Sequence, residues 1–316
     1  MTNHRYLRMC LSLFGAAKGM EPSKPTFRSI ALLLGMFLLL LCVPASFAET
    51  KEGGIDLSHL EKYGIEYREE HRTEPRPLAV FAVSIDMKER PNDPVKVVAV
   101  PAPQPEKVEN AEAILTNPLT LAEKKDVLIF LNTNPFAAIP GETRSGWYSG
   151  QPVDVCGTVV SESRQISPEQ QRHESFWVDH QGKVRMGAWQ EDEIAEGVAG
   201  FARILKEGMH ANVGGNDLHP RSAVGYDSAN QKLWFLVVDG RQNGYSEGVT
   251  TRELADLLLE LGCSDGINLD GGGSSVLIVK NQEGKWKVVN RPPGYEEAKN
   301  NLRPVPVGIG IQSLAP

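Results

Sequence analysis

The 316-residue sequence is poor in cysteine, the residue that cross-links small domains through disulfides and binds structural metals. It has four cysteines and no Cys-x-x-Cys pair, and two of the four lie within the first 48 residues. The remaining two, Cys156 and Cys263, lie far apart in the sequence. A disulfide between them and a pair of free thiols are equally compatible with the sequence. No Asn-x-Ser/Thr acceptor occurs, so glycosylation gives no indication of the compartment.

The sequence also lacks an excess of positive charge. It has 33 Lys and Arg against 40 Asp and Glu, a formal net charge of −7. Residues 1–48 carry five of the basic residues and one of the acidic ones, so the rest of the chain is still more acidic. Nucleic-acid binding depends on basic clusters that neutralise phosphates, and we therefore expect no nucleic-acid partner.

Long apolar runs are absent with one exception, residues 30–43, which read IALLLGMFLLLLCV. The run is short for a membrane span and ends near the small residues Ser46 and Ala48, as a secretory signal does before its cleavage site. We expect a signal peptide over 1–48, a secreted or periplasmic (cell-envelope) protein, and no stable membrane span after cleavage. The alternative is a chain anchored in the membrane by an uncleaved signal.

Beyond the signal, the charged segment 49–77 is predicted to be an N-terminal leader, and 78–316 a single catalytic domain. Apolar runs bounded by Gly, Pro and Asn predict strands in this domain. The expected strand regions are 78–87, 95–100, 127–132, 222–239 (as a strand pair), 267–269, 275–279 and 305–311. The segments around 175–180 and 183–189 are expected to form a hairpin.

Three helices are predicted. A short one is expected over 119–126, and an amphipathic one over 191–208, where apolar residues recur every three or four positions. The third begins at a capping box made by Thr250 and Glu253 and ends at Gly262. Strands outnumber helices, which predicts an α+β fold: a mixed, mostly antiparallel sheet with a few packed helices.

The stretch GINLDGGGSS, residues 266–275, is the strongest candidate for a functional site. Glycine allows close approach of the backbone to a ligand, and alternate residues of a strand share one face. No Lys follows the glycines and the GxGxxG spacing is missing, which excludes a P-loop and a dinucleotide-binding turn. A glycine-rich hairpin corner is the structural alternative. The candidate binding residues of this stretch are Asn268, Asp270, Gly271, Gly272, Gly273, Ser274 and Ser275.

Other polar residues follow apolar strands or precede them. Asn132 ends one predicted strand, Arg221 precedes another, and Asp239 with Arg241 follows a third. Each has a simpler interpretation, since Asp-Gly-Arg is also typical of a polar turn and Thr250 is a helix N-cap. Residues at the ends of neighbouring strands can converge, and two carboxylates with several arginines suit an anionic phosphate and acid–base catalysis.

The ordered motifs from 219 to 279 resemble the phosphodiester glycosidase family. The match consists of an Arg before a strand, Asp-Gly-Arg, Gly-x-Thr-x-x-Glu-Leu-Ala and Asn-Leu-Asp-Gly-Gly-Gly-Ser-Ser. Weaker similarity at 84–87, after 127–132 and at 303–311 extends it over most of 78–312. The chain departs from the family pattern at Asn132-Thr-Asn-Pro-Phe136, where relatives read Asn-Gly-Gly-Phe-Phe or similar; this departure affects the expected substrate entrance.

The resemblance implies an exported hydrolase that removes a sugar, similar to N-acetylglucosamine, from a sugar-1-phosphodiester and leaves a phosphomonoester. Asp270 and Asp239 are the expected carboxylate pair, and Arg221 is expected to bind the phosphate with Arg241 or Arg303. The glycine amides and the two serines would hold the remaining phosphate oxygens. The other expected substrate-binding residues are Asn132, Thr250 and Asn268.

Two other functions stay open at this point. A non-catalytic module could bind phosphorylated cell-surface glycans with the same residues, and in an envelope protein the glycines could be merely structural. No cofactor is expected with certainty. A divalent cation, calcium or magnesium, would suit Asp239, Asn268 and Asp270, although no metal-ligand spacing occurs.

Overall fold

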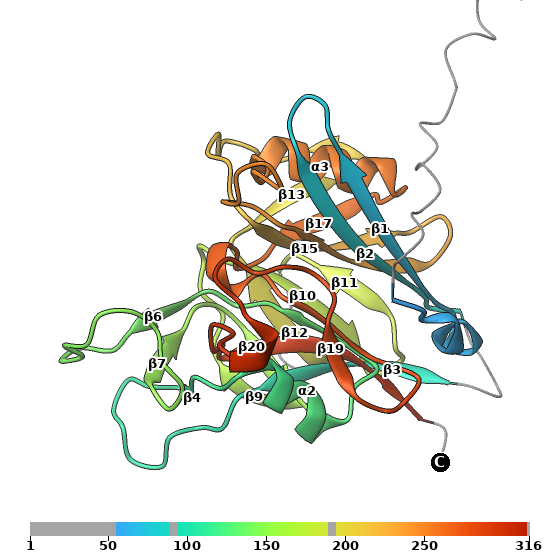
Figure 1. The fold of residues 1–316 in the computed structure, drawn as a ribbon. Coiled ribbons are helices and arrows are strands. Elements are labelled where there is room, and N and C mark those ends of the chain that lie inside the picture. The colour runs from blue at the N-terminus through green and yellow to red at the C-terminus, as the bar shows by residue number, and fades with distance from the viewer. Residues whose placement is uncertain (1–54, 89–93, 189–193, 315–316) are drawn as a thin grey trace, which may run out of the picture. The chain divides into compact units, whose positions relative to one another are not determined.

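The computed structural model describes residues 55–88, 94–188 and 194–314 (Figure 1). The expected signal peptide and its cleavage site lie outside these ranges. Within them, no helix combines the length and the apolar character needed to cross a membrane.

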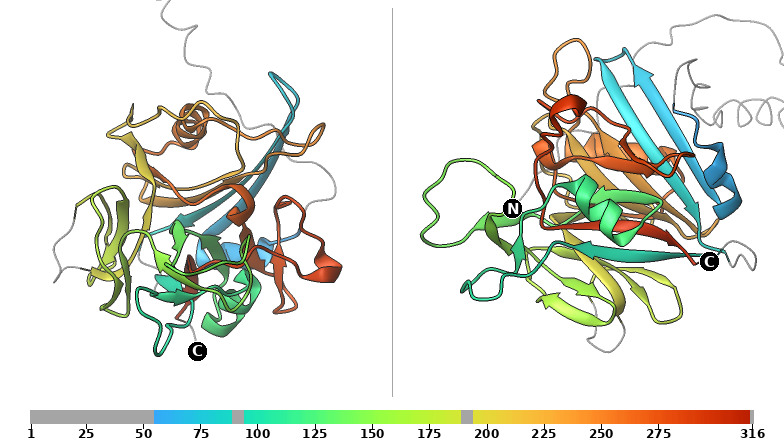
Figure 2. Two further views of the ribbon diagram at one scale, coloured as in Figure 1. Left: turned by 90° about the vertical axis from the view of Figure 1, so that its left-hand side faces the viewer. Right: turned by 60° about the horizontal axis from the view of Figure 1, so that its bottom comes forward.

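A seven-stranded sheet forms one layer, with α3 (Thr251–Glu260) on one of its faces (Figure 2). Its strands, in spatial order, are β1 (Ile65–Arg72), β2 (Leu78–Asp86), β16 (Lys232–Val238), β15 (Arg221–Asp227), β17 (Asp265–Asn268), β13 (Ala202–Lys206) and β14 (Met209–His210). β1 lies inside the segment predicted to be a leader and pairs with β2 from Ile65↔Ile85 to Arg72↔Leu78. This part of the leader is therefore an edge strand of the sheet.

Two five-stranded sheets and one three-stranded sheet complete the strand content. The first contains β19 (Trp286–Val288), β18 (Leu277–Lys280), β5 (Ile129–Asn132), β20 (Val307–Ser313) and β3 (Val95–Pro101). The second contains β11 (Val184–Met186), β10 (Glu174–Asp179), β12 (Ile194–Gly200), β8 (Val159–Ser161) and β9 (Arg164–Ser167). The small sheet contains β4 (Ala113–Ile114), β7 (Pro152–Val155) and β6 (Phe136–Ala138).

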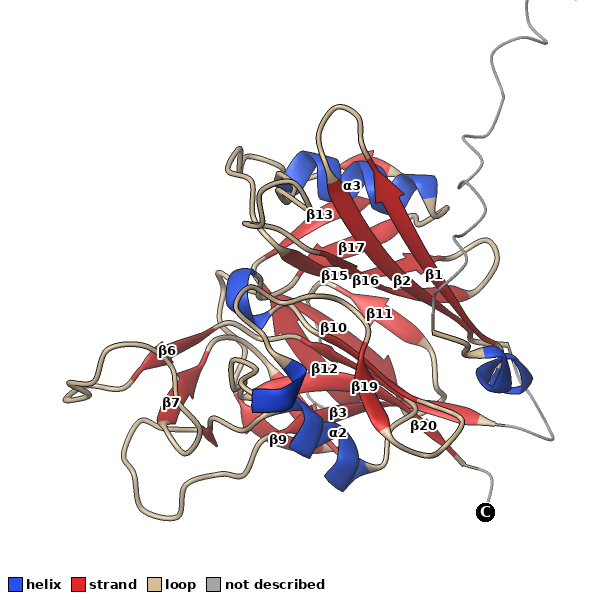
Figure 3. Cartoon of the chain, viewed as in Figure 1, coloured by secondary structure: helices blue, strands red, loops and turns tan. Residues whose placement is uncertain are grey.

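Helices are short and few beside these sheets (Figure 3). They are η1 (Ser58–Tyr63), α2 (Pro118–Lys125), α3, η3 (Gly272–Ser274) and η4 (Glu297–Lys299). The strand pairs of the described ranges are all antiparallel, so the mostly antiparallel prediction is confirmed, while the fold is more sheet-dominated than an α+β class implies. The predicted strands 78–87 and 95–100 form β2 and β3, which belong to different sheets.

The predicted helix over 191–208 is wrong. Ile194–Gly200 forms β12 and Ala202–Lys206 forms β13. The apolar spacing fits a helix, but glycines disfavour helix interiors. In addition, the position of Gly200 leaves no room for a side chain. A Cβ there would lie 2.6 Å from the backbone oxygen of Asn268. The close approach of β17 therefore decides the conformation, and local periodicity does not.

The central strands β2, β15 and β16 of the seven-stranded sheet are buried on both faces. Phe81, Val83 and other alternate residues pack into a core shared with the two five-stranded sheets. Val80 and Ala82 point the opposite way, toward α3. This is the two-residue alternation of a strand, and it explains why β2 reads as a continuous apolar run rather than as an amphipathic one.

Leu258 of α3 sits over two glycines of the sheet. Gly225 of β15 and Gly266 of β17 are register partners, and a Cβ at either would lie 2.8 Å and 2.4 Å from the methyl carbons of Leu258. Val249 lies just before α3, and its backbone oxygen accepts a hydrogen bond from Arg221. The packing of Leu258 on the sheet therefore also positions one side of the candidate site.

Leu258→Ala is expected to lower the free energy of unfolding by about 2–5 kcal/mol, because it removes a fully buried side chain and leaves a cavity over two glycines. Urea denaturation monitored by circular dichroism measures this. Leu259→Ala, at a less buried position of the same helix, is the control. Equal losses in the two variants would contradict the described packing.

Candidate active site

Four strand ends meet at one edge of the seven-stranded sheet. β15 begins at Arg221 opposite Val238, the last residue of β16, and Asn268 at the end of β17 pairs with Ala223. Asp239 follows directly on β16, and Asp270 stands two residues beyond the end of β17. The predicted convergence of polar residues at neighbouring strand ends is thus seen for these three strands, and the fourth, β5, reaches them through Asn132.

Asn132 joins the two sheets at this edge. Its Nδ2 donates to the backbone oxygen of Asp270 at 2.7 Å, and its Oδ1 accepts from Ser222 Oγ at 2.7 Å and from Val276 N at 3.1 Å. The side chain is 1% exposed. Asn132 therefore positions the Asp270 backbone from inside the protein, and its polar atoms are already used by protein groups.

Each glycine of the loop 270–275, here called the glycine loop, allows one close contact. A Cβ at Gly271 would lie 2.7 Å from the backbone oxygen of Pro220, and one at Gly272 would lie 3.1 Å from an Nη of Arg241. At Gly273 it would lie 2.5 Å from Cζ of Arg303. Two of the three glycines thus make room for guanidinium groups.

Four amides of the glycine loop donate to acceptors inside the protein. Gly271 N donates to Asp270 Oδ1 at 2.9 Å and Gly272 N to Pro220 O at 2.8 Å. Ser274 N and Ser275 N donate to carbonyls of the preceding turn. These four amides are therefore satisfied inside the protein, and the glycines at 272 and 273 allow the approach of arginine side chains.

Arg221, Arg241 and Arg303, here called the arginine cluster, surround the glycine loop and influence one another. Burial lowers the pKa of Arg221 and of Arg303, and the positive charge of Arg241 lowers both further. In the described ranges none of the three forms an ion pair within 4.0 Å. Arg221 donates to the carbonyls of Val249 and Asp217, and Arg241 donates to His219 Nδ1 at 3.1 Å.

Asp270 is the carboxylate that faces this positive charge. Burial raises its pKa to about 6, although Ser274, the amide of Gly271 and the Arg303 charge all act to lower it. The Ser274 hydroxyl lies near enough to influence the carboxylate but makes no hydrogen bond of standard geometry. At neutral pH Asp270 is mostly ionised, within reach of a proton at slightly lower pH.

Three further predicted residues have buried polar atoms without a protein partner. Asn268 Oδ1, Ser274 Oγ and Ser275 Oγ are shielded from solvent and unpaired in the described part of the chain. Buried polar groups are usually hydrogen-bonded, so three unpaired oxygen atoms within residues 268–275 indicate that a ligand or water completes the site. Thr250 differs, because its hydroxyl is engaged with Glu253 in the capping box.

Asp239 has no opening to solvent. Its side chain is 0% exposed, and its oxygens accept from Asn290 Nδ2 at 2.8 Å, Arg291 N at 2.7 Å and Tyr245 Oη at 3.2 Å. Asn290 also donates to Ser275 O and accepts from Leu277 N. Asp239 thus supports the glycine loop through Asn290, a residue that no sequence motif pointed to.

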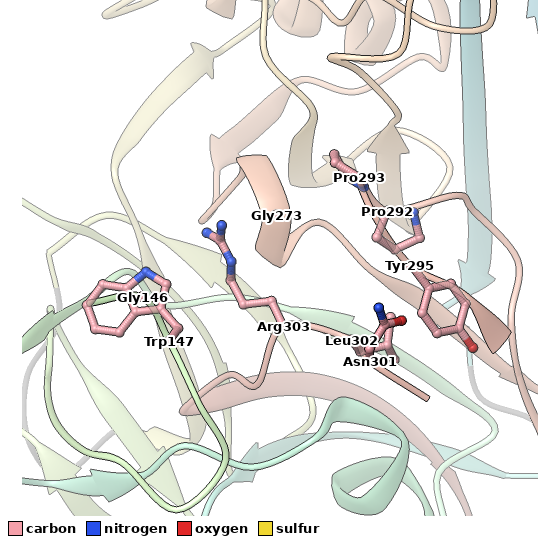
Figure 4. A pocket seen from close by; sticks show the side chains of 9 residues that line it. All are labelled: Gly146, Trp147, Gly273, Pro292, Pro293, Tyr295, Asn301, Leu302 and Arg303. Atoms are coloured by element: carbon pink, nitrogen blue, oxygen red, sulfur yellow. The ribbon is translucent and has the colours of Figure 1, made fainter. Parts of the chain in front are cut away.

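A pocket of about 210 Å³ opens beside the glycine loop (Figure 4). Gly273 and Arg303 form the wall that it shares with the arginine cluster. Its other lining residues were not predicted from the sequence: Gly146, Trp147, Pro292, Pro293, Tyr295, Asn301 and Leu302.

The expected divalent cation has no evident ligand set. Residues 55–88, 94–188 and 194–314 contain no group of three or more His, Cys, Asp or Glu side chains placed to hold a metal ion. The acceptors of Asp239 are occupied, and the arginine cluster would repel a cation at Asp270. Cys156 and Cys263 are both free thiols, which leaves the disulfide alternative without support.

The described fold and site can be compared with those of known proteins. A sequence profile of the phosphodiester glycosidase family matches residues 131–312, more than half of the chain. The chain therefore belongs to the phosphodiester glycosidase family.

Among solved structures, the catalytic domain of zebrafish N-acetylglucosamine-1-phosphodiester alpha-N-acetylglucosaminidase, auto-inhibited by its pro-peptide, is similar in fold. The TM-score is 0.55 at 17% identity, covering 78% of this chain and 82% of that one. A hypothetical protein from Synechocystis is similar with a TM-score of 0.51 at 13% identity, covering 78% and 62%. At these identities the likeness concerns the fold alone.

One sequence relative is an uncharacterized protein derived from the SPbeta prophage of Bacillus subtilis (strain 168). It is 41% identical over 83 residues, which is 26% of this chain and 12% of the relative. This chain thus spans only a small part of that protein's length.

Asp270→Asn is expected to stabilise the protein at pH 8. An ordinary Asp carboxyl has a pKa of 3.8, whereas burial raises the pKa of Asp270 to about 6. The folded state therefore favours the protonated form, and the protein loses stability as pH rises from about 4 to about 6. The neutral amide avoids this loss, which is on the order of 1–3 kcal/mol.

Urea denaturation at pH 4 and pH 8 measures the effect, and Glu109→Gln, at an exposed position, is the control. The gain from Asp270→Asn should nearly vanish at pH 4, where the wild-type carboxyl is protonated. A variant that is less stable than the wild type at pH 8 would rule out the described environment of Asp270.

Proposed function

We propose that this chain hydrolyses sugar-1-phosphodiesters, releasing the free sugar and a phosphomonoester. Arg303 carries the proposal. Its guanidinium is partly buried against Gly273 and has no hydrogen-bond or ion-pair partner in the described ranges of the chain. Partial burial of a guanidinium whose donors make no hydrogen bond is costly, and an anionic ligand offsets that cost.

A phosphodiester fits the charge distribution of the site. Guanidinium groups bind phosphate oxygens through paired, charge-assisted hydrogen bonds. Arg241 and Arg303 both approach the glycine loop, at Gly272 and Gly273. A phosphate held between them would relieve their mutual repulsion, which burial strengthens.

Asp270 acts on the sugar carbon in this proposal. The bond between that carbon and the bridging phosphate oxygen breaks, and the phosphate leaves with the bonding electrons. The ionised Asp270 stabilises the positive charge that develops on the carbon, and a water oxygen finally bonds to the carbon while its proton is released. A phosphomonoester is a weak base, so the leaving group needs little proton donation.

Asp239 supports this chemistry from behind the glycine loop. Its carboxylate is fully buried and saturated with hydrogen bonds, so we assign it a positioning role through Asn290 and Ser275 rather than contact with the substrate. N-acetylglucosamine is the sugar we propose, because a solved structure of similar fold carries that sugar in its name. We also propose export, on the basis of the apolar run at 30–43.

Hydrolysis of N-acetylglucosamine-1-phosphomethyl, followed by release of free sugar, tests the proposal. Asp270→Asn should lower kcat by about a hundredfold or more, and Arg303→Ala should lower kcat/KM about 10- to 100-fold through loss of a charged hydrogen bond. Arg252→Ala, an exposed arginine paired with His210, serves as the control.

The wild type could instead bind the diester without turnover, and Asp270→Asn could bind it equally well. This result would favour a non-catalytic module for phosphorylated glycans. The orphaned hydroxyl and amide oxygens are compatible with ligand binding in either case.

The pH dependence of kcat/KM offers an independent check. Because the proposed role requires ionised Asp270, kcat/KM should rise with pH and level off above about 6, the pKa of this carboxyl. A rate that falls through pH 6 as the carboxyl ionises would show that the protonated form is the active one.

A further inference from the structure

The strand β1 forms one edge of the seven-stranded sheet, and β2 is the single described strand that pairs with it (Figure 1). β1 is eight residues long, contains no proline or glycine, and pairs with β2 without a register shift. A long, regular edge strand offers a row of backbone donors and acceptors to another chain, and proteins usually cover or interrupt such edges.

The other edges of the described sheets differ from β1 in this respect. The edge strand β3 is covered, because Ala99 N donates to Glu196 Oε2 at 2.9 Å and Ser161 Oγ donates to Ala99 O at 3.5 Å. The edge opposite β1 in the seven-stranded sheet is β14, which has two residues. In the described part of the chain, β1 is therefore the edge best suited to pairing with another molecule.

The hydrogen bonds between β1 and β2 determine which backbone groups of β1 point outward. Asp86 N donates to Gly64 O at 2.9 Å, one position before β1 begins. Opposed residues of an antiparallel pair alternate between hydrogen-bonded and non-hydrogen-bonded positions, so the even-numbered residues of β1 bond to β2. The backbone N–H and C=O groups of the odd-numbered residues point away from β2; these residues are Ile65, Tyr67, Glu69 and His71.

The even-numbered side chains of β1 carry charges of alternating sign on one face of the sheet. This is the face covered by α3, because their register partners in β2 include Val80 and Ala82, which pack in the α3 cluster. The charged residues follow in the order Glu66, Arg68, Glu70 and Arg72. A row of one sign would repel a copy of itself, whereas an alternating row attracts a copy in the right register.

The charge order selects one register for pairing with a second copy of the chain. A two-fold axis perpendicular to the sheet keeps each face continuous, so the axis must pass between one residue and its own copy. An axis at Glu69 places Glu66 opposite Arg72 and Arg68 opposite Glu70, each pair occurring twice. An axis at residue 68 or 70 would instead bring like charges into opposition, which is destabilising.

The same register satisfies the outward backbone groups. Glu69 faces the partner subunit's Glu69, and Tyr67 faces the partner subunit's His71 on each side of the axis. These odd-numbered positions are the hydrogen-bonded ones. The charged pairs occupy the non-hydrogen-bonded positions, where opposed side chains come closer together. The two Glu69 carboxylates are farther apart, and each is held in its own protomer by Tyr67 Oη at 3.1 Å and His71 Nε2 at 2.8 Å.

We propose that this protein forms a two-fold dimer in which β1 pairs antiparallel with β1 of a second copy, centred on Glu69. The two seven-stranded sheets then become one continuous sheet. Val238, beside the candidate active site, is opposite Val80 and thus level with Glu70 near the end of β1. The two-fold axis therefore places the two sites at opposite ends of the joined sheet, and the strand pairing involves neither of them. The inference is independent of the proposed function.

Sedimentation velocity of the full chain at increasing concentration tests the dimer. The weight-average mass should rise from that of one chain toward twice that value between about 1 and 100 μM, because a single strand pair makes a small interface. A mass that stays at one chain over this range overturns the proposal, whether or not a sugar-1-phosphodiester is hydrolysed.

Two charge reversals test the register. Glu66→Arg and Arg72→Glu each bring like charges into opposition twice, so each should weaken the dimer about tenfold or more. Mixed in equal amounts, the two variants should form a heterodimer of wild-type affinity, because every opposed pair again has opposite signs.

The mixture also excludes a disturbed fold as the cause, since two misfolded variants would not restore each other. Lys285→Glu makes the same change of charge in an exposed turn and should dimerise like the wild type. Failure of the two variants to form a heterodimer overturns the proposed register.

Two substitutions of Glu69 separate the backbone from the side chain. Proline is tolerated in an edge strand where the N–H points away from the sheet, so Glu69→Pro should keep the fold, checked by circular dichroism, and abolish the dimer. Glu69→Ala keeps the N–H and removes the opposed carboxylates, so it should dimerise at least as tightly as the wild type. Equal dimerisation of the two variants would show that another surface joins the chains and would overturn the pairing of β1.

Discussion

The hydrogen bonds of Asn132 are the constraint on which the candidate site depends. One buried side chain ties the backbone of Asp270 to Ser222 in the seven-stranded sheet and to Val276 beside the neighbouring sheet. Removing a buried hydrogen-bonding hub leaves several groups unpaired at once, so such networks hold a unique arrangement. The backbone of Asp270 is thereby placed by the junction of two sheets.

The glycine loop adds a second constraint, which is electrostatic. Glycines at 272 and 273 let two guanidinium groups come closer to the backbone than any side chain would permit. Positive charge therefore gathers around the loop, where the charge of Asp270 acts on Arg303 and that of Asp217 acts on Arg221. Proteins concentrate such strain and perturbed pKa values at functional sites, where a ligand offsets them. Asp239 and Asn290 support the loop from the buried side.

The sequence predicted the parts of the site that lie in contiguous motifs. The capping box at Thr250, the strand ending in Asn268 and the position of Asp270 follow from local chemistry and spacing. Asn290 and Trp147 could not be predicted, because their contacts arise only when distant segments meet. Roles are also harder to predict than positions: Asp239 reads as a catalytic carboxylate, and the structure shows it fully buried and hydrogen-bonded to Asn290, Arg291 and Tyr245. The wrong prediction of a helix over 191–208 has the same origin, because the packing of Gly200 against β17 outweighs the local periodicity.

The central claim is that this site breaks the bond between the sugar carbon and oxygen, and leaves the phosphorus untouched. Hydrolysis of N-acetylglucosamine-1-phosphomethyl in water enriched in oxygen-18, followed by mass spectrometry of both products, tests it most directly. The account predicts that the label enters the hydroxyl group of the released sugar and that methyl phosphate stays unlabelled. Label in the phosphate would mean attack at phosphorus and would contradict the role assigned to Asp270.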